Sequence, residues 1–148
     1  MSDDETLFDV PLFSAFTAAY ETIFKGTNGR KLRSNMTAYF RKALEYEIST
    51  YEPDTKSPQN SAHALRSYLQ SHGVEASITH DDSTVRVEFT TDIFSGITQK
   101  VAKLRVEKIY MSVLVKGLLG ENWVHRTAYK KGDTIGHIIT KKRGRRTE

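Results

Sequence analysis

The stretch that decides the fold is Val101–Thr140, VAKLRVEKIYMSVLVKGLLGENWVHRTAYKKGDTIGHIIT. Its first half, Val101–Leu119, carries apolar residues at roughly helical spacing, which predicts one long helix that ends at Gly120. The second half predicts two strands, Asn122–Tyr129 and Thr134–Thr140, joined by a turn of two lysines, a glycine and an aspartate. We expect the other elements to pack on this segment, because it is the most hydrophobic one in the chain.

The residues before this stretch predict three helices and a pair of strands. Apolar side chains recur at helical spacing in Val10–Lys25, from about Leu32 to about Thr50, and in Ser61–His72. Apolar and polar residues alternate in Val74–Ile78 and again in Val85–Phe89, as they do in strands with one apolar face. This pattern predicts an antiparallel sheet that has one face in water.

The element order is therefore three helices, two strands, a long helix and two strands. It predicts an α+β fold with N-terminal helices packed on an antiparallel sheet of about four strands, and with the long helix between the two strand pairs. The start of that helix stays open within about 95–106, because Thr90–Lys100 suits either the end of a strand or the beginning of a helix. The register of the last hairpin also stays open. A turn centred on Lys131 places His125 opposite His137, and a shift of one residue places Ile138 there instead.

The positive charge is concentrated at the C-terminal end. The formal net charge is +4, and acidic residues slightly outnumber basic ones once five tail residues are set aside. A chain of 148 residues suits one domain, so we expect a globular domain over residues 1–140 and a disordered basic tail over 141–148. The near-neutral body argues against a wholly basic nucleic-acid-binding surface and leaves the tail as the anion-binding candidate. Its basic residues are Lys141, Lys142, Arg143, Arg145 and Arg146.

Several classes of chemistry lack their usual residues. The chain has no Cys, which excludes disulfides, thiolate chemistry and sulfur-ligated zinc. It has no run of about 18 apolar residues, and its acidic start differs from a secretory signal, so we expect a cytoplasmic protein. The nucleophile elbow, the phosphate loop and the dinucleotide fingerprint are absent. These absences favour a non-enzymatic protein without excluding an enzyme; we assign no catalytic residue, and no particular cofactor is indicated.

Among five histidines, the hairpin places only His125 and His137 close to one another. Two imidazoles make half of a zinc site, and no third ligand is evident, so we predict no metal centre. An ordinary pair of hairpin histidines is the favoured interpretation. As a hypothesis, such a pair gives the protein pH sensitivity in the physiological range.

Three short motifs, together with the element order, resemble the four-vinyl-reductase-type domain, which is related in fold to small subunits of the TRAPP vesicle-tethering complex. Thr91–Phe94 matches the corner after the strand pair, Lys116–Gly120 matches the end of the long helix, and Lys131–Asp133 matches the hairpin turn. Family members often carry Cys in the corner and the hairpin, where this chain has none. The resemblance implies a small-molecule-sensing module with a pocket between helices and sheet, and often a dimer formed through the helices.

From the resemblance and the many aromatic residues, we expect a non-enzymatic domain that binds a hydrophobic or aromatic small molecule and forms a homodimer. The expected pocket is apolar and lined by Phe40, Phe89, Tyr110, Leu114 and Trp123. The first alternative is a TRAPP-like scaffold or adaptor subunit that acts through protein–protein assembly. The second is a nucleic-acid-binding protein that uses the basic tail.

Overall fold

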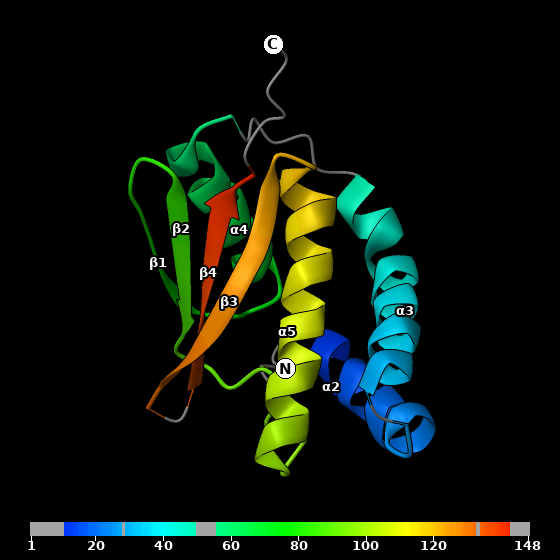
Figure 1. The fold of residues 1–148 in the computed structure, drawn as a ribbon. Helices are drawn as coiled ribbons and strands as arrows, with labels where there is room; N and C mark the ends of the chain where they lie inside the picture. Colours follow the sequence, from blue (N-terminus) through cyan, green and yellow to red (C-terminus); the bar gives the residue numbers. More distant parts are fainter. Residues whose placement is uncertain (1–10, 28, 50–55, 133, 143–148) are drawn as a thin grey trace, which may run out of the picture.

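The computed structural model describes residues 11–27, 29–49, 56–132 and 134–142. The four helices of this part and its sheet confirm the predicted α+β class (Figure 1). In chain order, the elements are α2 (Pro11–Ala19), the π-helical turn η1 (Tyr20–Phe24), α3 (Gly29–Ser49), α4 (Pro58–Ser71), β1 (Ala76–His80), β2 (Thr84–Phe89), α5 (Lys100–Leu114), the π-helical turn η2 (Val115–Leu119), β3 (Trp123–Lys131) and β4 (Thr134–Lys141).

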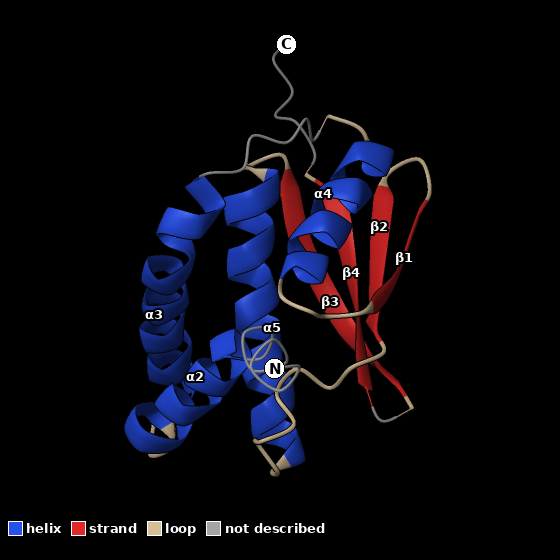
Figure 2. Ribbon diagram, turned by 180° about the vertical axis from the view of Figure 1, so that it is seen from behind, coloured by secondary structure: helices blue, strands red, loops and turns tan. Residues whose placement is uncertain are grey.

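The sheet is antiparallel and has the strand order β1-β2-β4-β3. Side chains alternate between a buried and a wetter face; on β2, for example, Val85 and Val87 are fully buried and Arg86 between them is exposed. Helices α4 and α5 cover the buried face, and α3 and α2 pack on the far side of α5, away from the strands (Figures 1 and 2). The first two helices therefore pack mainly on α5, and α3 also meets α4, where the Tyr68 hydroxyl donates a hydrogen bond to Glu47.

An aromatic cluster joins α2, α3 and α5. The Tyr110 ring lies 5.4 Å from Phe13 and 5.6 Å from Phe40, both in edge-to-face geometry. Phe16 and Phe94 complete the cluster. Edge-to-face pairs add about 0.5–1.5 kcal/mol each to the burial of the rings, so the helices are joined here by dense packing.

Helix α5 begins at Lys100, which settles the point that the sequence left open. The side chain of Gln99 accepts a hydrogen bond from the backbone N–H of Ala102 and so caps the first turn. The helix widens into the π-helical turn η2 and ends at Gly120, whose φ of +91° a side chain would disfavour. The predicted end at Leu119 is confirmed.

Both registers considered for the hairpin are wrong, because β3 contains a bulge. His125 pairs with Ile139, and the register shifts between His125 and Thr127, so that Ala128 pairs with His137. A bulge reverses the side-chain alternation after it. Trp123 and His125 therefore face the helices, whereas Tyr129 lies on the wet face and donates a hydrogen bond to Glu88.

No helix in the described ranges is long and apolar enough to cross a membrane.

Strand β4 runs to Lys141 and takes in the first residue of the predicted tail.

Candidate functional site

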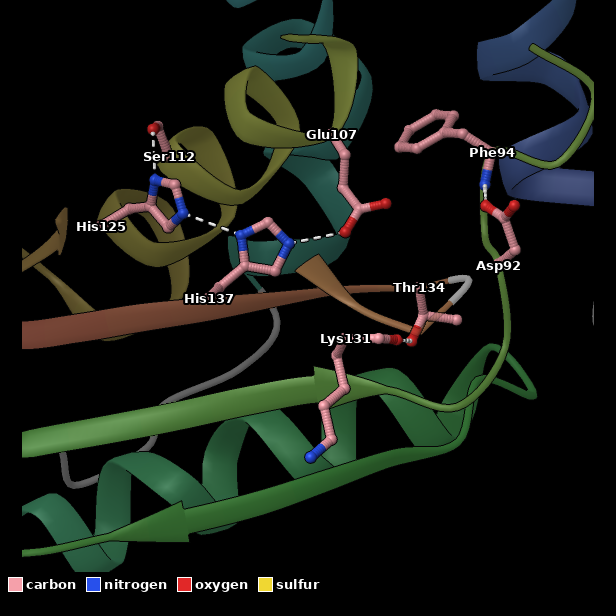
Figure 3. Close-up of polar contacts among 8 residues, drawn as sticks. All are labelled: Asp92, Phe94, Glu107, Ser112, His125, Lys131, Thr134 and His137. Atoms are coloured by element: carbon pink, nitrogen blue, oxygen red, sulfur yellow. Dashed lines mark hydrogen bonds and ion pairs between the residues drawn. The ribbon is translucent and has the colours of Figure 1, made fainter. Parts of the chain in front are cut away.

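A chain of four polar side chains runs from the molecular surface into the core (Figure 3). The Ser112 hydroxyl lies 3.3 Å from Nδ1 of His125, and Nε2 of His125 lies 2.9 Å from Nδ1 of His137. Nε2 of His137 lies 2.6 Å from Oε2 of Glu107. We call these four residues the relay.

Each side chain reaches the relay because of its place in the fold. His137 is on the central strand β4 and is 0% exposed, and Glu107, on the sheet-facing side of α5, is 2% exposed. The bulge in β3 leaves His125 on the inner face, where its ring lies 5.0 Å from that of His137. Ser112 follows Glu107 by five residues on α5 and is exposed. The relay therefore has a solvent-exposed end at Ser112, which we call its wet end, and a buried end at Glu107.

Burial keeps the relay uncharged near neutral pH. It raises the pKa of Glu107 from 4.5 to about 8; the nearby Asp92 charge adds to this rise and Lys103 opposes it. It lowers the pKa of His125 and of His137 from 6.5 to about 3. Burial therefore favours the neutral form of both groups in the contact between His137 and Glu107.

A groove with a volume of about 490 Å³ lies between α3 and α5, next to the wet end of the relay. Ser112 is one of its lining residues, and the lining is mostly apolar. The others are Thr37, Arg41, Leu44, Glu45, Ile48 and Ser49 from α3, and Val113, Lys116 and Gly117 from α5 and η2. A Cβ added at Gly117 would come within 3.0 Å of the Ile48 side chain, so the glycine permits close approach of the two helices at the groove. The volume falls within the range of roughly 300–1,000 Å³ found for small-molecule pockets.

The five residues predicted to line a pocket are all buried, at 0–2% exposure. Phe40 and Tyr110 meet in the aromatic cluster, and the Phe89 ring packs edge-to-face on that of His137 at 5.6 Å. Leu114 and Trp123 belong to the same hydrophobic core. None of the five lines the groove, so their role as ligand contacts stays a prediction.

The predicted anion-binding tail is only partly within the described residues. The Lys141 ammonium donates a hydrogen bond to the backbone oxygen of Lys56, and the Lys142 backbone N–H donates one to Asn122. Arg143, Arg145 and Arg146 lie outside the described residues. Nucleic-acid or lipid binding by the tail stays a prediction.

Sequence reasoning brought the two histidines together but missed both ends of the relay. Glu107 had a signal, because it shares a helical stripe with Tyr110 and Leu114, where a carboxylate is out of place. Ser112 had no signal. Across the described ranges, no group of three or more His, Asp or Glu side chains is arranged to hold a metal ion. No family model, no curated protein and no solved structure matches the chain.

Proposed function

We propose that the protein binds an amphipathic anion of small-molecule size in the groove between α3 and α5. The observation that carries this proposal is a mostly apolar groove whose lining includes two cationic side chains, Arg41 and Lys116. The apolar part of the ligand fills the groove, and its carboxylate or similar group pairs with the Arg41 guanidinium. The pocket of the proposal thus lies between two helices rather than between helices and sheet.

The charges around the groove support an anion. Arg41 takes part in none of the ion pairs found within the described ranges. Lys116 is 3.9 Å from Glu121, and both side chains are largely exposed, so this contact is weak. Glu45 is the one carboxylate in the lining against two cations. The balance favours a negatively charged ligand.

Apolar burial alone does not give tight binding here. An alkyl chain that buries about 200 Å² gains about 5 kcal/mol, at roughly 25 cal/mol per Å². Association costs about 4 kcal/mol or more in lost freedom of motion. The charged contact must therefore supply much of the affinity, so a fatty acid should bind better than the alcohol of the same chain length.

Titration calorimetry with dodecanoate, kept below its micelle concentration, tests the proposal. We expect saturable binding of one dodecanoate per chain and weaker binding of dodecanol. Arg41→Gln should weaken dodecanoate binding about tenfold or more, because a hydrogen bond to a charged group contributes about 1.5–3 kcal/mol. Lys42→Gln is the matched control, because it removes an exposed cation of α3 that does not line the groove.

A groove-filling variant, Thr37→Trp, should abolish binding while circular dichroism shows an unchanged fold. Binding that survives both Thr37→Trp and Arg41→Gln, or the absence of binding to the original protein, would refute the proposal. If light scattering instead shows self-association that Thr37→Trp removes, the groove is an interface between two copies of this chain. That result would favour the scaffold alternative. Salt-sensitive nucleic-acid binding that disappears when residues 141–148 are deleted would favour the tail alternative.

A further inference from the structure

The relay has no part in the binding function just proposed, yet it ends at the groove. A buried polar network needs an explanation, because its groups lose hydration and gain stability only if every one is paired. Glu107 and His137 are in the core, and each is joined to the next member at hydrogen-bond distance. The hydroxyl of the exposed member, Ser112, lies 3.3 Å from a histidine nitrogen.

The hydrogen bonds of the relay allow two arrangements of protons. When Glu107 is ionised, His137 donates to it, His125 donates to His137, and the Ser112 hydroxyl donates to Nδ1 of His125. When Glu107 is protonated, every donor and acceptor is reversed, and Nδ1–H of His125 donates to Ser112. The two arrangements differ by one proton, which enters or leaves at the Ser112 end and is held at Glu107. In neither of them does an imidazole carry a charge.

We propose that Ser112 is a nucleophile that takes the acyl group from carboxylic esters, with His125 as its general base and His137 and Glu107 as positioning residues. A serine hydroxyl bonded to a histidine whose other nitrogen is held in turn is the arrangement that activates such nucleophiles. Lys116, which lines the same groove, supplies positive charge for the oxyanion that forms on the carbonyl. The preference for apolar acyl chains rests on the proposed function of the groove; the reactivity of Ser112 does not.

The reaction balances with water as the only co-reactant. The Ser112 oxygen attacks the carbonyl carbon, its proton passes to Nδ1 of His125, and two further transfers carry a proton from His125 to His137 and from His137 to Glu107. The bond between the carbonyl carbon and the alcohol oxygen then breaks. The leaving alcohol takes a proton from Nδ1 of His125 as the transfers reverse, and the acyl group stays on Ser112. Water attacks this acyl group by the same steps, which releases the carboxylic acid and restores the hydroxyl.

The surroundings of the relay set the pH at which it works. The charged or titratable groups that influence it are Asp92, from the segment before α5, and Lys103, Lys108 and Tyr110 on α5 itself. From the sheet, Phe89 presents an apolar ring to His137. Because burial holds the pKa of Glu107 at about 8, the arrangement in which Ser112 donates to His125 becomes more populated as the pH rises toward 8.

The test uses the whole chain and p-nitrophenyl acetate, whose short acyl group does not need the groove. We expect release of p-nitrophenolate and one acetyl group on Ser112, located by peptide mass spectrometry. Ser112→Ala and His125→Ala should each lower the rate about 100-fold or more. His63→Ala, which removes an exposed histidine of α4, should leave the rate unchanged.

A pH profile separates a positioning role of Glu107 from a merely structural one. The acylation rate of the original protein should rise with pH, with an inflection near 8 and a plateau above it, and Glu107→Gln should remove this inflection. An acetyl group found elsewhere, or a rate that Ser112→Ala does not change, would overturn the proposal even if Glu107→Gln fails to fold.

Chain length separates the inference from the binding function. A lower KM for p-nitrophenyl octanoate than for the acetate supports both proposals. Acylation of Ser112 with equal KM values supports Ser112 as the nucleophile and refutes the groove as a chain-binding site. Dodecanoate binding without acylation supports the groove as a binding site and refutes Ser112 as the nucleophile.

Discussion

Replacing the buried carboxyl of Glu107 by an amide should change how stability depends on pH. The side chain of Glu107→Gln keeps the shape of the protonated acid and can still donate a hydrogen bond to Nε2 of His137. It cannot ionise. The variant should therefore match the original protein below about pH 4.5, where this carboxyl is protonated in the folded and the unfolded state, and exceed it in stability at higher pH.

The sign and size follow from the pKa values. The pKa of Glu107 rises from 4.5 to about 8 on folding, so the native state binds the extra proton between these values. The free energy of unfolding then falls as the pH rises, by up to about 1.4 kcal/mol per pH unit. The pKa values of His125 and His137 fall from 6.5 to about 3 on folding, so stability also falls as the pH drops below 6.5. We expect a maximum near pH 6.5 and a net loss of about 1 kcal/mol between there and pH 8.

Urea unfolding at closely spaced pH values measures this dependence. The original protein should lose stability on the alkaline side of the maximum, a decline that we call the alkaline limb. Glu107→Gln should lose no stability over the same window. Glu75→Gln, at an exposed position before β1, should keep the original profile. Parallel alkaline limbs for the original protein and Glu107→Gln would refute the assignment of that limb to Glu107.

Three further changes test other contacts. A Cβ at Gly136 would lie 2.3 Å from the Tyr129 ring, so Gly136→Ala should lower the free energy of unfolding by about 1–3 kcal/mol; in a Tyr129→Ala background the same change should cost much less, and an equal cost in both would contradict the clash. Ser57→Ala removes the side chain that caps α4 through the N–H of Asn60 and should cost about 1 kcal/mol in urea unfolding, whereas no change would show that the cap is dispensable. Lys103→Met removes a cation that lowers the pKa of Glu107 and pairs with Asp92 at 2.6 Å, so the alkaline limb should move to higher pH; a move to lower pH would be inconsistent with this electrostatic picture.

The elements of the fold were predictable because each has local signals. Apolar spacing marked the helices, Gly120 marked the end of η2, and the Gly and Asp of the last turn marked the hairpin. The bulge at His125–Thr127 had no such signal, since its residues alternate in the sequence like those of a regular strand. A bulge depends on what the partner strand and α5 require, and this information is spread across the fold.

The site was half predictable for the same reason. The hairpin alone predicted that His125 and His137 lie close together. The register that brings them together contains a bulge, which the sequence did not predict. The third group, Glu107, comes from a position 30 residues before His137, and only the packing of α5 on the sheet brings the two together. In sequence, the stripe that Glu107 shares with Tyr110 and Leu114 marks it as unusual, but nothing there indicates that its partner is His137.

The burial of the relay argues that it does more than hold the fold together. Apolar side chains of similar volume could fill the positions of Glu107 and His137, and such replacements of buried polar groups are often neutral or stabilising. The protein instead keeps a carboxyl whose ionisation on the alkaline side works against folding, and it connects this carboxyl step by step to a hydroxyl at the surface. A purely structural network would gain nothing from that exposed end, whereas a network that moves a proton requires it. The placement of Ser112 at the edge of an apolar groove is therefore the feature on which a functional interpretation of the core rests.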